Sequence, residues 1–149
     1  MAHFHFRLAS LLQYRENLRD QCRQILAQWL QRDADLAAEQ QRLEQERELQ
    51  LAEMSAEQVQ QTKLQVDKLV SRRYRAGQLS AELSALAQRR SELAEQIALC
   101  RKALLKADQG VKALEQLAEK QRAEFRYAEE RREAREREEI WQAGHWKDR

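Results

Sequence analysis

The sequence predicts an all-α protein, a long two-helix antiparallel coiled-coil hairpin. Three observations predict this fold. The 149-residue chain contains no proline and only three glycines, too few turn-forming residues for a sheet protein or a compact bundle of many helices. Its dominant residues, Ala, Glu, Gln, Leu and Arg, are all good helix formers. Its apolar residues recur at the 3.5-residue spacing of a coiled coil along two long stretches.

Charge and hydropathy narrow the class of protein. The 27 Lys and Arg residues nearly balance the 25 Asp and Glu residues, and the mean hydropathy is −0.90. The two signs alternate along the chain, whereas a basic DNA-binding domain usually carries a one-sided Lys/Arg stripe. No apolar run reaches the roughly 18 residues of a membrane span, and no secretory signal opens the chain. The expected location is therefore the cytoplasm.

The first helix is predicted over about residues 4–74. Alternating steps of four and three residues from Phe4 meet an apolar side chain at most positions as far as Leu43, with only three charged interruptions. Beyond Leu43 the phase of this stripe is lost. Trp29 belongs to the stripe, so we expect it to anchor the helix seam rather than to line a ligand site.

A turn is predicted at about residues 75–80. Three arginines just before it suit the last turn of a helix, where cations favour the negative end of the helix dipole. Gly77 can take the left-handed conformation that often follows a helix, and Ser80 can cap the next one. Two alternatives remain open. The turn could lie near Glu53–Gln58, where the stripe loses its phase, or the chain could be one uninterrupted helix that dimerises.

The second helix is predicted over about residues 81–141, followed by a frayed tail at 142–149. A stripe at the same spacing starts at Leu79 and continues to Arg132, with polar residues at only three positions. A run of this length rarely arises by chance. It is the strongest structural signal in the chain, and with the first helix it makes one coiled-coil domain.

A register centred on Gly77 pairs the two predicted arms. It places Phe125 near Trp29, Cys100 near Met54 and Cys22 near Arg132. The two cysteines are then too far apart for a disulfide within the chain, and both fit small buried seam positions.

The same register leaves the opening apolar stripe uncovered. It sets the polar residues 126–141 opposite the first leucines of the chain, and an uncovered apolar stripe usually marks an interface. Trp141 and Trp146, together with Phe4 and Phe6, would make this open end aromatic, as interfaces often are. The alternative is that long Arg and Glu stems cover the leucines, or that the register is shifted.

No catalytic, cofactor or metal site is predicted. Three widely spaced glycines cannot form a phosphate-binding loop, and the cysteines and histidines do not follow zinc-ligand spacing. His3 and His5 lie at the extreme terminus. The many carboxylates of the tail have no pocket in which to act as acid or base, so we do not expect an enzyme.

The two ends of the chain resemble a known family. The pattern F-x-F-R-L-x-x-L-L-x-x-R-E at residues 4–16 resembles the start of the flagellar FliJ family, and residues 119–140 are similar to its Lys/Arg/Glu-rich close. The resemblance implies a two-helix antiparallel coiled coil, similar to the stalk of rotary ATPases, in the flagellar type III export apparatus. The stalk protein of virulence-associated secretion systems has the same shape and stays open as a relative.

The family also implies partners and a location. The open end would insert into the ring of the export ATPase FliI, and the turn region would contact the membrane-embedded export gate FlhA. Escort of export chaperones is a further implied role. The protein would then be cytoplasmic and peripheral at the inner face of the cell membrane, held there by its protein partners.

Partner-binding residues are therefore expected at both ends of the hairpin. The residues expected at the ATPase end are Phe4, Phe6, Leu8, Leu11, Leu12 and Leu18. Those expected at the gate end, by position alone, are Leu64, Lys68, Tyr74 and Arg75. Two other functions stay open: a generic cytoplasmic coiled-coil scaffold or tether without a motor partner, and a nucleic-acid or membrane-surface binder that uses the arginine-rich tail, which the interspersed glutamates disfavour.

Overall fold

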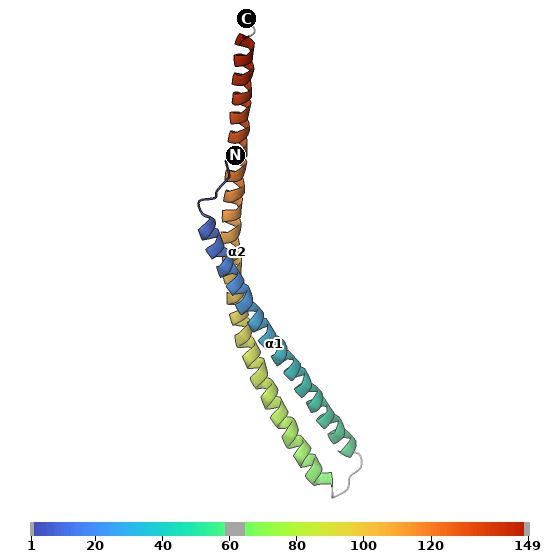
Figure 1. The fold of residues 1–149 in the computed structure, drawn as a ribbon. Coiled ribbons are helices and arrows are strands. Elements are labelled where there is room, and N and C mark those ends of the chain that lie inside the picture. Colours follow the sequence, from blue (N-terminus) through green and yellow to red (C-terminus); the bar gives the residue numbers. More distant parts are fainter. Residues whose placement is uncertain (1, 59–64, 148–149) are drawn as a thin grey trace. The chain divides into compact units, whose positions relative to one another are not determined.

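Two long helices make up the computed structural model, which describes residues 2–58 and 65–147. Helix α1 spans Ala9–Gln58 and helix α2 spans Gln65–Lys147 (Figure 1). The two helices pack against each other, so the predicted all-α class and coiled-coil hairpin are confirmed. By their contacts the residues form two compact units, one of residues 1–21 with 104–149 and one of residues 22–103.

The predicted start of the first helix is wrong by several residues. Residues 2–8 precede α1 and are not helical. The Phe6 carbonyl accepts a hydrogen bond from the Ala9 amide at 3.2 Å, and the Leu8 carbonyl accepts one from the Leu12 amide at 2.9 Å. These two bonds lead the chain into the first turn of α1, so Phe4 and Phe6 lie on a short non-helical segment.

The predicted turn at residues 75–80 is also wrong, because this stretch is helical and lies inside α2. The alternative turn position, Glu53–Gln58, is also helical, because it forms the last part of α1. A glycine inside a helix costs only about 1 kcal/mol, and a Cβ added at Gly77 would meet nothing within 4 Å. The buried neighbours Ala76 and Leu79 keep this stretch in the helical seam.

The predicted frayed tail is helical as well. Helix α2 continues to Lys147, well beyond the expected end near residue 141. Ala, Gln, Arg and Glu are good helix formers, and residues 126–147 contain no proline to stop the helix.

The unit of residues 22–103 is held by an apolar seam. Leu43 of α1 is 2% exposed and lies in one cluster with Leu79, Leu83 and Leu86 of α2, against which Leu36 packs. Each buried leucine stabilises the fold by roughly 1.5–3 kcal/mol. The spacing of the three α2 leucines is that of the predicted stripe, which the structure places in the seam.

The unit of residues 1–21 and 104–149 has a smaller apolar core. Its buried side chains are Phe6, Ala107 and Val111. Phe4 contacts Phe125, with ring centroids 5.7 Å apart, and the Arg15 side chain passes 3.7 Å from the place a Cβ would occupy at Gly110. The opening residues therefore run antiparallel to residues 110–125 of α2.

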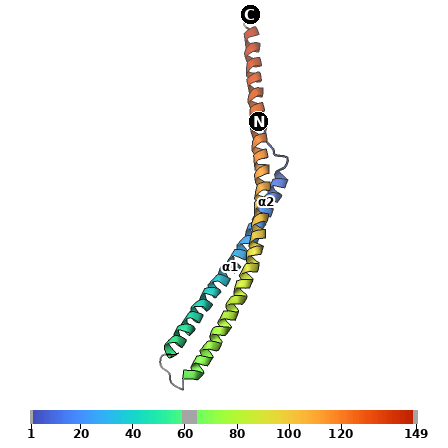
Figure 2. The ribbon, with the colours of Figure 1, turned by 180° about the vertical axis from the view of Figure 1, so that it is seen from behind.

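This arrangement overturns the predicted register. Phe125 lies beside Phe4, not near Trp29, so the register centred on Gly77 is wrong. Because α2 begins earlier than predicted, its residues meet earlier parts of the chain than the predicted register gave them. The opening stripe consequently meets apolar residues of α2 rather than the polar stretch 126–141. Two opposite views agree that, in this unit, α2 continues past the N-terminal segment (Figures 1 and 2).

Candidate partner-binding surfaces

The N-terminal segment is fixed to α2 by aromatic contacts. The Phe4 and Phe125 rings are inclined at 51°, an orientation typical of favourable aromatic pairs. The Arg122 guanidinium lies 5.7 Å from the centre of the Phe4 ring, within the range of a cation–π contact. Phe6 is 9% exposed. Phe4 and Phe6 were both predicted to bind a partner. In the structure Phe4 packs on Phe125 of α2, and Phe6 is buried within the hairpin.

The leucines that follow are only partly covered. Leu8 and Leu11 are 39% and 40% exposed, and Leu12 and Leu18 are half-buried. We name these four residues the opening surface. Leu8 directly precedes α1 and the other three lie in its first turns, and part of their apolar area is in contact with solvent.

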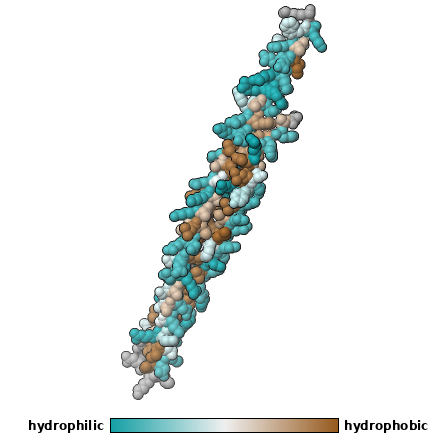
Figure 3. Space-filling view, turned by 90° about the vertical axis from the view of Figure 1, so that its left-hand side faces the viewer, coloured by the Kyte–Doolittle hydropathy of each residue, from teal (hydrophilic) through white to brown (hydrophobic). Residues whose placement is uncertain are grey.

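The end of α2 has no packing partner among the residues that the structure describes. Every residue from 130 to 147 is exposed, and the ribbon shows this part of α2 alone beyond the N-terminal segment of its unit (Figure 2). Its surface is mostly hydrophilic with isolated hydrophobic groups (Figure 3). We name residues 130–147 the α2 extension. The sequence reasoning missed it, because the wrong register assigned these residues a partner.

Three large apolar side chains lie on the α2 extension. Ile140, Trp141 and Trp146 are 72%, 67% and 83% exposed. The Trp141 ring stacks on His145, with centroids 5.3 Å apart and the planes 8° from parallel. The two tryptophans are therefore largely exposed to solvent, whereas Phe4 and Phe6 pack on the hairpin.

The charges of the α2 extension interact mainly within the helix. Arg132 pairs with Glu129 at 2.9 Å and with Glu136 at 3.6 Å. Arg137 Nε donates a hydrogen bond to the Glu133 carbonyl at 3.3 Å. Such exposed pairs contribute little stability, and helices without tertiary packing are only marginally stable. A binding partner would therefore stabilise this segment considerably.

The gate-end residues lie near the start of α2. Tyr74 is 69% exposed, Lys68 is exposed and Arg75 is half-buried, whereas Leu64 lies outside the described residues. Val66 and Val70, at 56% and 63% exposure, precede Tyr74 by eight and four residues. An exposed apolar stripe on one helix face results. The four-residue spacing of Val66, Val70 and Tyr74 is the signal in the sequence from which this stripe could have been predicted.

A groove of about 680 Å³ lies between α1 and α2 in the unit of residues 22–103. Trp29, Leu36 and Leu93 are among its lining residues, and the Arg32 guanidinium lies 5.1 Å from the centre of the Trp29 ring. Trp29 is half-buried. Trp29 was expected to anchor the helix seam rather than to line a ligand site. In the structure it lies at the seam and also lines this groove.

Two carboxyl groups near the seam have lowered pKa values because arginines bind them. Hydrogen bonds from Arg90, followed by its charge, lower the pKa of Asp33. Hydrogen bonds from Arg42 likewise lower the pKa of Glu39. Within the part of the chain that the structure describes, no three His, Cys, Asp or Glu side chains lie together as a metal site would require.

Comparison with known proteins identifies no relative. No protein-family model matches the chain, and neither a curated protein sequence nor a solved structure matches it. Among the described residues, neither helix contains a stretch apolar enough to cross a membrane.

Proposed function

We propose that the chain is a stalk protein of the flagellar type III export apparatus, of the FliJ family, that binds the export ATPase FliI with its open end. The observation that carries the proposal is the exposure of Leu8 and Leu11, 39% and 40%, within the motif at residues 4–16 that resembles the family. Leucines on a helix that are fixed in place but partly uncovered suit a protein interface.

The energetics of this surface support binding by burial. Complete burial of one leucine contributes roughly 1.5–3 kcal/mol, and the four residues of the opening surface retain part of that gain for a partner. The α2 extension adds Ile140, Trp141 and Trp146 in the same unit. Tryptophan is among the residues that contribute most to interfaces, so a ring-shaped partner would have apolar contacts available on both helices.

The other end of the hairpin is proposed to contact the export gate FlhA. Support comes from Tyr74 and Lys68, which are exposed, and from the apolar stripe that Val66 and Val70 form beside them. In this role the chain acts by binding, with no catalysis and no cofactor. It stays peripheral to the membrane through its protein partners, and escort of export chaperones belongs to the same proposal.

The test is ATP hydrolysis by the flagellar export ATPase of the same organism, with and without the purified chain. Ring assembly is followed in parallel by electron microscopy. We expect stimulation of hydrolysis by the wild-type chain and its loss with Leu8→Glu, Leu11→Glu. The matched control is Ile25→Glu, Leu30→Glu, since these residues lie on the same helix at 47% and 40% exposure. Equal stimulation by both variants would contradict the assignment of the ATPase end.

The second candidate function is a coiled-coil scaffold without a motor partner. The exposure of Ile25 and Leu30 on α1, and of Leu99 and Leu105 on α2 at 59% and 58%, favours it, because a second copy could cover them. Light scattering at micromolar concentration separates the two candidates. A stable dimer that fails to stimulate the ATPase supports the scaffold, and a strict monomer contradicts it.

A further inference from the structure

Within the unit of residues 22–103, the contacts between the two helices change in kind along their length. Residues 44–56 of α1 and 66–75 of α2, named here the turn end, differ from the rest. On α2, apolar side chains are buried at intervals from Ala76 as far as Ile97, and on α1 Leu43 is buried against them. Among residues 44–56 of α1 and 66–75 of α2, all of which the structure describes, no side chain is buried. The buried apolar seam therefore stops about four turns before the end of α1 at Gln58.

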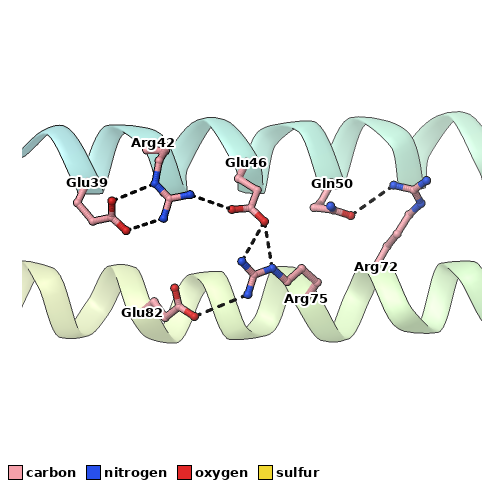
Figure 4. Close-up of polar contacts among 7 residues, drawn as sticks. All are labelled: Glu39, Arg42, Glu46, Gln50, Arg72, Arg75 and Glu82. Carbon is pink, nitrogen blue, oxygen red and sulfur yellow. Dashed lines mark hydrogen bonds and ion pairs between the residues drawn. The ribbon is translucent and has the colours of Figure 1, made fainter.

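Polar contacts replace the seam over this stretch. Arg75 Nη2 and Nε lie 3.0 Å and 3.1 Å from Glu46 Oε1. Arg72 Nη1 donates to Gln50 Oε1 at 3.4 Å and also pairs with Glu53. Both arginines reach from α2 to α1 (Figure 4). We name these contacts the polar clasp.

Each member of the polar clasp is partly exposed to solvent. The exposed fractions of the side chains are 38% for Arg75, 29% for Glu46, 27% for Arg72 and 42% for Glu53. Pairs of this exposure typically contribute 0.2–1 kcal/mol and are screened by salt. A buried leucine such as Leu79 contributes more, roughly 1.5–3 kcal/mol, and salt does not screen that contribution.

Most of the large apolar residues in this stretch are exposed, and Met54 and Leu69 are half-buried. Leu49 and Leu51 of α1 are 58% and 49% exposed, and Val66, Val70 and Tyr74 of α2 are 56–69% exposed. Separation of the helices here would break the polar clasp but would remove no buried apolar side chain from the seam. The free energy of this local opening is therefore much smaller than that of global unfolding.

We propose that the polar clasp is a salt-sensitive switch. The turn end, residues 44–56 and 66–75, opens while the apolar seam from Leu43 to Ile97 stays closed. Opening exposes the inner faces of both helices to solvent. Arg75 also lies 3.7 Å from Glu82 in α2, and Arg42 lies 3.7 Å from Glu46 in α1, so each half of the main pair has a second partner in its own helix once the helices separate (Figure 4).

Hydrogen exchange of the full chain, read by mass spectrometry, tests the proposal. Protection is compared at about 0.02 M and about 1 M salt, where the screening length falls to roughly 3 Å. We expect residues 44–56 and 66–75 to be less protected than residues 79–97 at low salt. At high salt their exchange should accelerate about threefold or more, with no change at residues 79–97.

Variants assign the effect to the polar clasp. Arg72→Gln, Arg75→Gln should accelerate exchange of the turn end at low salt and abolish its salt dependence. The control, Arg126→Gln, Arg132→Gln, removes two arginines that pair with Glu119, Glu129 and Glu136 of α2 itself and should leave the turn end unchanged. Equal protection of the turn end and the seam, or salt-independent exchange of the wild type, would overturn the proposal. So would an effect of the control as large as that of the clasp variant.

Discussion

Arg90 of α2 and Asp33 of α1 form a two-point ion pair across the seam. Arg90 Nε lies 3.0 Å from Asp33 Oδ1 and Nη2 lies 3.3 Å from Oδ2, while Nη1 donates to Gln40 Oε1 at 3.1 Å. Arg90 occupies a position at which apolar residues otherwise recur. A polar residue at one such position selects a register, because any shift of α1 along α2 would leave Arg90 without its carboxylate.

Loss of this pair should destabilise the hairpin in a pH-dependent way. The folded-state pKa of Asp33 is lowered, first by the hydrogen bonds from Arg90. Its stabilisation is therefore complete above the unfolded pKa of about 3.9 and is lost as the pH falls through the lower folded pKa. We expect Asp33→Asn to lower the melting temperature at neutral pH, and the difference from wild type to shrink as the pH falls below the unfolded pKa of Asp33. Thermal melts followed by circular dichroism measure this.

Asp35→Asn is the matched control for that measurement. Asp35 lies two residues away and accepts a hydrogen bond from Gln31 of its own helix at 3.0 Å. Its replacement should change stability little. If Asp33→Asn and Asp35→Asn lower the melting temperature equally, the ion pair does not fix the register.

Replacement of Gly77 tests the position of the turn. Gly77 lies inside α2, and an added Cβ would meet nothing within 4 Å. Gly77→Ala should therefore raise the free energy of unfolding by about 0.5–1 kcal/mol, measured by urea denaturation. A glycine in a left-handed turn would respond in the opposite direction, so destabilisation by Gly77→Ala would return the turn to residues 75–80.

Truncation of seam and surface leucines should differ sharply. Leu79 is 0% exposed and Leu99 is 59% exposed, both on α2. We expect Leu79→Ala to cost about 2–5 kcal/mol of unfolding free energy and Leu99→Ala to cost less than about 1 kcal/mol. Urea denaturation of both variants provides the comparison. Similar losses would mean that the seam lies on another face of α2.

The contact between Phe4 and Phe125 predicts a coupling in stability. A double-mutant cycle with Phe4→Ala and Phe125→Ala should give an interaction free energy of about 0.5–1.5 kcal/mol, typical of aromatic pairs. The cycle of Phe4→Ala with Tyr127→Ala is the control, because Tyr127 is 62% exposed and contacts Arg131 at 5.7 Å. Zero coupling between Phe4 and Phe125 would mean that the N-terminal segment does not pack on this part of α2.

The period of the apolar stripe predicted the fold class and part of the core. Leu43 on the first stripe and Leu79, Leu83, Leu86, Leu93 and Ile97 on the second are all buried, since residues at this spacing share the face that one helix turns to the other. Spacing does not decide where a helix ends. Gly77 followed by Ser80 has the composition of a turn, but burial of Ala76 and Leu79 outweighs the small helix penalty of one glycine.

Only part of the candidate site could be predicted from the sequence. Leu8 and Leu11 are partly exposed, as the sequence indicated, although that expectation was based on the wrong register. The α2 extension could not be found, since its isolation depends on the register, and the register depends on the turn. One misplaced turn thus gave residues 126–141 a partner that they do not have.

The most direct test of the proposed function is the affinity of the purified chain for the flagellar export ATPase, measured by isothermal titration calorimetry. We expect saturable binding that weakens about tenfold or more with Leu8→Glu, Leu11→Glu, since two leucines of the opening surface would then meet the partner as charges. The control variant Ile25→Glu, Leu30→Glu should bind like wild type. No binding by the wild-type chain, or equal affinity of all three proteins, would contradict the proposal.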